Sequence, residues 1–141
     1  MNLPERELID PLMWDLIVHL YKAGFETGAC CQGRRTLEEF KKKKHCPQAY
    51  ISFIKPLPVE VIQQARKIEL IPYGITKPDE NESCIESISV WTATAPGKIG
   101  VAGYRKSWFQ EKHHVECWKY EAKLKVISAN ETFIDKIRSI M

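Results

Sequence analysis

The chain has 141 residues, of which 44% are hydrophobic, 28% are charged and 10% are aromatic, with a formal net charge of +3. This length predicts one domain over residues 1–141, and the composition excludes a disordered chain and a coiled coil. No apolar run approaches the roughly 20 residues that span a bilayer, and the N-terminal segment lacks the basic and apolar regions of a signal peptide. We therefore expect a cytoplasmic protein with no membrane association.

The N-terminal element is predicted to be an amphipathic helix. Asp10 is a favourable N-cap, Pro11 is suited to the first helical position, and Gly24 predicts the end of the helix. Apolar residues recur at helical spacing and predict the buried stripe. They are Leu12, Leu16, Ile17 and Leu20.

A strand and a short helix are predicted next. Residues 25–31 are predicted to form a short strand that leads into a turn. Thr36 and Glu39 have the spacing of a capping box, which predicts a helix that continues to Lys44. The Cys46-Pro47 sequence then ends this helix.

The middle of the chain predicts strand, helix and strand. Residues 49–55 alternate, with Ala49, Ile51 and Phe53 on one face. Pro58 begins a helix whose predicted inward side chains are Val59, Ile62, Ala65 and Ile68. Residues 70–75 are predicted to form a strand that Pro72 confines to an edge or a bulge.

The C-terminal part predicts more strands and a last helix. Residues 84–94 and 98–104 are predicted to form a hairpin. Residues 115–127 alternate between apolar and charged side chains, which predicts a half-buried strand. Asn130 or Ser128 is then predicted to cap a helix that carries Phe133, Ile134, Ile137 and Ile140. The expected fold is a single α+β domain, a mostly antiparallel sheet with helices packed on one face.

The turn after the first strand is a candidate anion site. Gly33 permits close backbone approach, so the amides of residues 31–34 could form an anion-binding nest, and Arg34 and Arg35 could clamp phosphate oxygens. Residues 31–55 hold seven basic and two acidic side chains, a local excess of five. The alternative is that these charges form an ordinary solvated helix face.

A basic and aromatic segment at residues 105–114 is a second candidate. Trp108 and Phe109 could stack on a base, while Arg105 and Lys106 contact phosphates. The alternative is that the two aromatic side chains seal the core or an oligomer contact. The predicted ligand-binding residues are Cys31, Gly33, Arg34, Arg35, Arg105, Lys106, Trp108 and Phe109.

Cysteine and histidine side chains offer a further site. The five cysteines are an odd number, which favours reduced thiols over a disulfide framework. The pairs Cys30-Cys31 and His45-Cys46 are separated by an interval typical of zinc ligand pairs, but neither pair has the internal spacing of a zinc motif. We therefore expect buried thiols, with no metal, no cofactor and no catalytic residue, and we keep a zinc site as the alternative.

Two motifs carry a resemblance to known proteins. A GFxTxxxCxG turn at residues 24–33 and a YIxF strand at residues 50–53 resemble a group of small uncharacterised phage and prophage proteins. More distantly, residues 27–34 are similar to the TxxSCSGR motif of the third wybutosine-synthesis enzyme, a tRNA-modifying methyltransferase. Cys31, Gly33 and Arg34 match that motif, whereas both of its serines are replaced.

These features together predict a binding protein. Small phage proteins of this size include sponges that sequester cyclic-nucleotide or cyclic-ADP-ribose signals of bacterial defence systems. We expect non-enzymatic sequestration of a small phosphorylated nucleotide in the host cytoplasm, by a chain that forms a homo-oligomer to cover its sheet edges. The alternatives are an RNA-binding or RNA-modifying protein, which the wybutosine similarity implies, and a protein-binding inhibitor.

Overall fold

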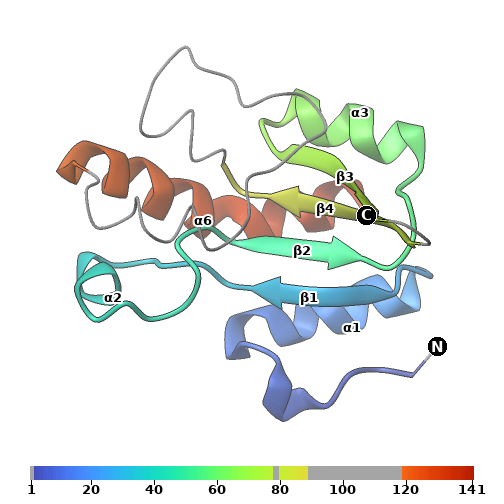
Figure 1. The fold of residues 1–141 in the computed structure, drawn as a ribbon, viewed down its shortest axis with the longest axis horizontal. Coiled ribbons are helices and arrows are strands. Elements are labelled where there is room, and N and C mark those ends of the chain that lie inside the picture. The colour runs from blue at the N-terminus through green and yellow to red at the C-terminus, as the bar shows by residue number, and fades with distance from the viewer. Residues whose placement is uncertain (1, 78–79, 89–118) are drawn as a thin grey trace.

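The fold is known from a computed structural model that describes residues 2–77, 80–88 and 119–141 (Figure 1). Two 3-10 turns, Arg6–Leu8 and Pro11–Met13, precede the first α-helix. The helices are α1 (Trp14–Lys22), α2 (Leu37–Lys41), α3 (Val59–Lys67) and α6 (Tyr120–Ile140). The strands are β1 (Thr27–Cys31), β2 (Tyr50–Phe53), β3 (Ile71–Lys77) and β4 (Glu80–Glu86).

The four strands form one antiparallel sheet in the order β1-β2-β4-β3. In register, Ile51 of β2 lies opposite Cys30 of β1 and opposite Ile85 of β4. Strand β3 is an edge strand, so Pro72 lies where its missing amide does least harm to the ladder. The predicted strands at residues 25–31, 49–55 and 70–75 are therefore confirmed.

Helices α1, α3 and α6 cover one face of the sheet. Helix α6 runs behind the strands in Figure 1 and contacts both α1 and α3. Their inward side chains share one core with alternate residues of the strands. It contains Met13, Leu16, Ile17, Leu20, Ala49, Ile51, Phe53, Leu57, Ala65, Leu70, Ile85, Phe133 and Ile137. The predicted α+β fold, with helices on one face of an antiparallel sheet, is confirmed for the described residues.

The strand predicted at residues 115–127 is wrong where the structure describes it, because residues 120–140 form one helix. The first turns of α6 contain Glu, Ala, Lys and Leu, which are strong helix formers. Ala122 and Val126 are buried one helical turn apart, whereas Leu124, between them, is exposed. Every second residue of this segment is apolar, which predicted a strand, but only every second one of these apolar residues is buried. The buried residues are therefore four positions apart, as on one face of a helix.

Asn130 does not cap a helix, contrary to prediction, but lies in the middle of α6 and is fully buried. Its side-chain amide nitrogen donates to the carbonyls of Arg34 and Pro47, at 2.7 and 2.8 Å. Its side-chain oxygen accepts from the Ala49 amide and the Ser87 hydroxyl, at 2.8 and 2.7 Å. The amide thus uses all four of its hydrogen-bonding positions and joins α6 to three other segments of the chain.

The N-terminal α-helix begins later than the sequence predicts, at Trp14 and not at Pro11. Residues 11–13 form a 3-10 turn, and the side chain of Asp10 caps neither this turn nor α1. Leu12 is 49% exposed, and the neighbouring Met13 is fully buried in its place. The tighter 3-10 turn rotates the side chains relative to an α-helix, which shifts the buried stripe by one residue.

Two other predicted helix features also change. Val59, predicted to face inward, is 62% exposed at the start of α3. Helix α2 ends at Lys41 and not at Lys44, since Lys43 and His45 adopt positive φ angles of 54° and 56°. The strand predicted at 84–94 ends at Glu86, and residues 89–94 and 98–104 lie outside the described residues.

None of the helices in the described ranges has the length and apolar character that crossing a bilayer requires.

The Asn130 amide is expected to contribute strongly to stability. We predict that Asn130→Ala lowers the free energy of unfolding by about 3–5 kcal/mol, since buried partners lose their hydrogen bonds and a cavity forms. Urea denaturation followed by circular dichroism measures this loss. Glu131→Ala, at the adjacent exposed position, is the control and should change the value by less than about 0.5 kcal/mol. An equal effect of the two substitutions would contradict the role of Asn130.

Candidate functional site

The turn between β1 and α2 uses its backbone amides internally. Each amide of residues 32–35 donates to an acceptor elsewhere in the chain or in the turn itself. The pairs are Gln32 to Asp10 Oδ2 at 2.9 Å, Gly33 to Cys31 Sγ at 3.5 Å, Arg34 to the Pro47 carbonyl at 3.2 Å, and Arg35 to Glu39 Oε1 at 2.8 Å. The predicted anion-binding nest at residues 31–34 is therefore wrong, because the amides of residues 32–34 already donate to acceptors within the chain.

Gly33 serves packing at this turn. Its φ angle is 74°, and a Cβ atom at this position would lie 2.5 Å from the Ala49 amide nitrogen and from Asn130 Nδ2. No side chain fits there unless backbone or the buried Asn130 amide moves. The glycine thus allows α6 to approach the turn closely. Its predicted role was to let an anion approach the backbone.

Arg34 points inward and organises the loop after α2. It is 3% exposed, its Nε donates to the Lys44 carbonyl at 2.8 Å, and its guanidinium lies 5.2 Å from the centre of the Phe40 ring. Burial lowers the pKa of Arg34 from its usual value. These contacts give the side chain a structural role in holding residues 42–46 against α2.

Arg35 is half-buried and only partly paired. Its Nη2 donates to the Asn130 carbonyl at 3.3 Å, whereas its Nε is buried and has no hydrogen-bond partner among the described residues. The capping box that follows is present: the Thr36 hydroxyl accepts from the Glu39 amide at 3.1 Å. The Glu39 carboxylate reaches back to the Arg35 amide, one residue before the N-cap.

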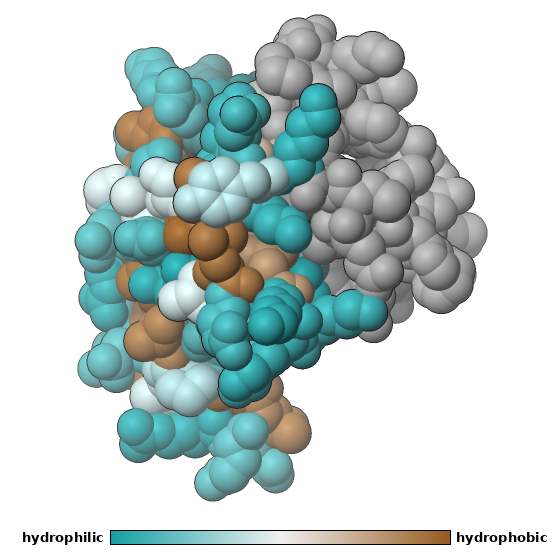
Figure 2. All heavy atoms as spheres, turned by 90° about the vertical axis from the view of Figure 1, so that its left-hand side faces the viewer, coloured by the Kyte–Doolittle hydropathy of each residue, from teal (hydrophilic) through white to brown (hydrophobic). Residues whose placement is uncertain are grey.

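The lysine run at residues 41–44 is exposed at the same end of the molecule. Lys42 forms an ion pair with Glu38 at 3.2 Å, and the ammonium groups of Lys41 and Lys44 form none with the described residues. This end, which is at the left of Figure 1, is mostly hydrophilic with a narrow band of hydrophobic side chains (Figure 2). The second predicted group, Arg105, Lys106, Trp108 and Phe109, lies outside the described residues.

Cys30 and Cys31 face opposite sides of the sheet. Cys30 packs against the core between sheet and helices, and burial, together with Asp10 and Cys46, raises its pKa to about 12. Cys31 is buried on the other face, and its sulfur accepts hydrogen bonds from the Cys46 amide at 3.1 Å and the Gly33 amide. A hydrogen bond with the Cys46 thiol and burial both raise the pKa of Cys31. In the protein without a bound metal ion, the Cys31 thiol is therefore protonated at neutral pH, unlike the thiolate of an activated nucleophile.

Asp10, Cys31 and His45 come together at the end of β1, and we refer to them as the Asp10–Cys31–His45 cluster. One side-chain donor atom from each lies within 4.8 Å of the other two. Asp10 Oδ1 is 3.5 Å from His45 Nδ1, and Glu39 Oε2 is 3.4 Å from His45 Nε2. Sequence reasoning missed Asp10, because an Asp-Pro pair is a helix-start signal and nothing local links it to residues 31 and 45.

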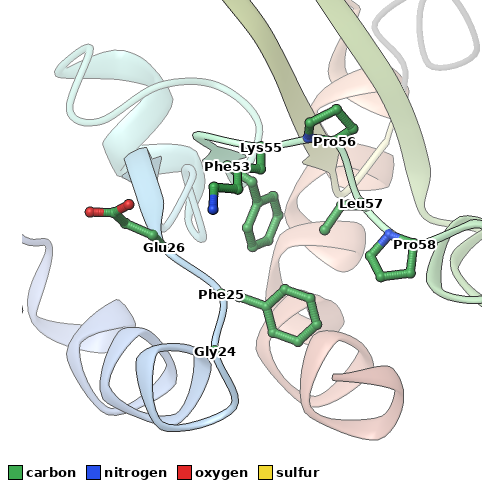
Figure 3. Close-up of a pocket in the computed structure, with 8 residues that line it drawn as sticks. All are labelled: Gly24, Phe25, Glu26, Phe53, Lys55, Pro56, Leu57 and Pro58. Carbon is green, nitrogen blue, oxygen red and sulfur yellow. The ribbon is translucent and has the colours of Figure 1, made fainter. Parts of the chain in front are cut away.

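A small apolar hollow lies beyond the opposite end of β1 (Figure 3). It has a volume of about 230 Å³, below the range of about 300–1,000 Å³ that is usual for ligand pockets. The Phe25 and Phe53 rings meet edge to face within it, 6.3 Å apart at 74°. Glu26 and Lys55 are the charged residues in its lining. Its small volume and the contact between the two aromatic rings indicate a gap in side-chain packing at the edge of the core.

Comparisons of the chain with protein-family models, with curated proteins and with solved structures found no match. A functional assignment therefore has to come from the residues at the turn: the partly paired Arg35, the lysine run, and the Asp10–Cys31–His45 cluster.

The buried thiol of Cys31 is expected to resist alkylation. We predict that iodoacetamide modifies Cys31 in the folded, metal-free protein at least about 100-fold more slowly than in urea, because access requires local unfolding. Peptide mass spectrometry after timed quenching measures the rate at this residue. Equal rates in the folded and unfolded protein would indicate an accessible, reactive thiol and would contradict the geometry described above.

Proposed function

We propose that this protein binds a small phosphorylated nucleotide and sequesters it without chemical conversion. The observation that carries the proposal is Arg35, whose Nε is buried and has no hydrogen-bond partner among the described residues. An unpaired buried donor costs about 1–3 kcal/mol, and more when it is charged. A phosphate oxygen would satisfy this donor with a charge-assisted hydrogen bond, which the guanidinium geometry favours.

The charge around this position supports the proposal. The four lysines of residues 41–44 are exposed, and Lys42 forms an ion pair with Glu38. Such a concentration of positive charge attracts phosphate-bearing ligands and increases their association rate. In the proposal, Arg105 and Lys106 add phosphate contacts and Trp108 or Phe109 stacks on the base.

The chemistry of the turn supports binding without turnover. The Cys31 thiol is buried and protonated, so it lacks the features of a nucleophile. Sequestration requires only an affinity that exceeds that of the competing receptor. We propose that the ligand is a signalling nucleotide, with cyclic nucleotides and cyclic ADP-ribose as the first candidates, and that its removal acts in phage counter-defence.

Calorimetric titration with a panel of cyclic and linear nucleotides tests the proposal. We expect one member of the panel to bind and to be recovered unchanged after heat release. Arg35→Ala should weaken this binding at least about tenfold, the equivalent of about 1.4 kcal/mol, through loss of a charge-assisted hydrogen bond. Arg66→Ala, which removes an exposed arginine of α3, is the matched control and should bind as the wild type does.

Three results would contradict the proposal. One is the absence of binding across the panel, and another is equal binding by the wild type and Arg35→Ala. A third is recovery of a chemically altered nucleotide, which would indicate an enzyme. Binding of tRNA with an affinity that falls steeply with salt, and no nucleotide binding, would support the RNA alternative instead.

A further inference from the structure

Three potential metal ligands from separate segments of the chain meet at the end of β1. Asp10 precedes the 3-10 turn Pro11–Met13, Cys31 ends β1, and His45 follows α2. We propose that the Asp10–Cys31–His45 cluster is a binding site for one divalent metal ion, with Zn²⁺ as the preferred ion. This inference is independent of nucleotide binding and uses none of the charged side chains assigned to phosphate.

The distances within the cluster suit a tetrahedral ion. Bonds of 2.0–2.3 Å at tetrahedral angles place neighbouring ligand atoms about 3.3–3.7 Å apart. Asp10 Oδ1 and His45 Nδ1 are already 3.5 Å apart, and all three donor atoms lie within 4.8 Å of one another. Small side-chain rotations are therefore enough to bring the sulfur to bonding distance, and no strand or helix has to move.

The far side of the His45 ring is also arranged for metal binding. When Nδ1 binds the ion, Nε2 carries the proton and requires an acceptor. Glu39 Oε2 lies 3.4 Å from Nε2, and the Arg35 amide holds the other oxygen of the same carboxylate at 2.8 Å. This is the carboxylate–histidine–metal arrangement, in which a second carboxylate orients the ring and increases its basicity.

The sulfur of Cys31 lies in a suitable environment. It accepts hydrogen bonds from the Cys46 and Gly33 amides, at 3.1 and 3.5 Å, and such donors stabilise a thiolate. Metal binding releases the thiol proton, so the ion replaces the proton that burial otherwise retains. The Cys46 thiol is in hydrogen-bond contact with Cys31, but it does not belong to the group of donor atoms that lie within 4.8 Å of one another.

Gln32 contacts the same histidine ring. The residue is 8% exposed, its Nε2 is 3.2 Å from His45 Nε2, and its Oε1 is buried with no hydrogen-bond partner among the described residues. If the ion is on Nδ1, Nε2 is a donor and faces the Gln32 amide nitrogen, which is also a donor. A half-turn of the amide would place Oε1 beside Glu39 Oε2 as a second acceptor for the same N–H, and would move the Gln32 amide nitrogen into the buried position.

The donor set favours zinc over the common hard cations. Magnesium and calcium prefer oxygen ligands, whereas thiolate and imidazole with one carboxylate suit zinc. Bound zinc would join the segment between the two N-terminal 3-10 turns to β1 and to the loop after α2. An ion that binds the folded chain more tightly than the unfolded chain raises the free energy of unfolding by an amount that grows with the logarithm of its affinity.

Cobalt and zinc titrations of the full chain test this proposal. One equivalent of Co²⁺ should produce the near-ultraviolet sulfur-to-cobalt charge-transfer band and the strong visible absorption of a tetrahedral site. Native mass spectrometry should show one zinc ion per chain. Competition with a chromophoric chelator should show that Cys31→Ser weakens zinc binding at least about 100-fold, since loss of a direct ligand costs more than the 10–100-fold that follows loss of a group that only orients a ligand.

Cys30→Ser is the matched control, because Cys30 is adjacent in sequence but faces the core. It should retain the charge-transfer band and bind zinc within about threefold of the wild type, because no ligand is removed. If Cys31→Ser does not fold, His45→Asn provides the second variant, since asparagine tolerates the positive φ of 56° at this position. His45→Asn should also weaken zinc binding, by at least about tenfold.

The proposal is overturned if the wild type binds Co²⁺ without a sulfur charge-transfer band or binds no zinc. It is also overturned if zinc affinity is unchanged in the Cys31 and His45 variants, which would locate the ion elsewhere in the chain. An equal loss in Cys30→Ser would indicate a general effect on folding. Because none of these measurements uses a nucleotide, their outcome does not depend on the function proposed above.

Discussion

The side-chain amide of Asn130 is the interaction on which the rest of the structure depends. Its four hydrogen bonds reach Arg34, Pro47, Ala49 and Ser87, so one buried group of α6 positions the turn after β1, the start of β2 and the end of β4. A fully satisfied buried amide is favourable, whereas one with missing partners is costly, so these segments are ordered together. The absent Cβ of Gly33 gives this amide the space it occupies.

The order imposed by Asn130 determines the chemistry that remains at the turn. The backbone amides of residues 32–35 are used internally, and Arg34 is buried against Phe40. The available chemistry is therefore in side chains: Arg35 and the lysine run for phosphate, and the Asp10–Cys31–His45 cluster for a metal ion. Glu39 connects the two, since one carboxylate oxygen accepts from the Arg35 amide and the other faces His45.

Much of the fold follows from local patterns. Strands β1, β2 and β3 and helices α1, α2 and α3 were predicted within a few residues, because each has a clear period or capping signal. The prediction failed at α6, where an alternating pattern coincided with buried residues spaced four apart, such as Ala122 and Val126. It also failed at Asn130, because a polar residue in a helix interior is unfavourable unless distant segments provide its hydrogen-bond partners.

The sequence by itself determined the α+β class, the mostly antiparallel sheet, the confinement of Pro72 to an edge or a bulge, and the concentration of positive charge near residues 31–55. These depend on composition and on contacts between residues close in the chain. Only the tertiary structure decided that Gly33 serves Asn130, that Arg34 is buried, and that Asp10 lies beside Cys31 and His45. These depend on contacts between residues far apart in sequence, and no local periodicity encodes which distant groups will complete a buried hydrogen bond or a ligand set.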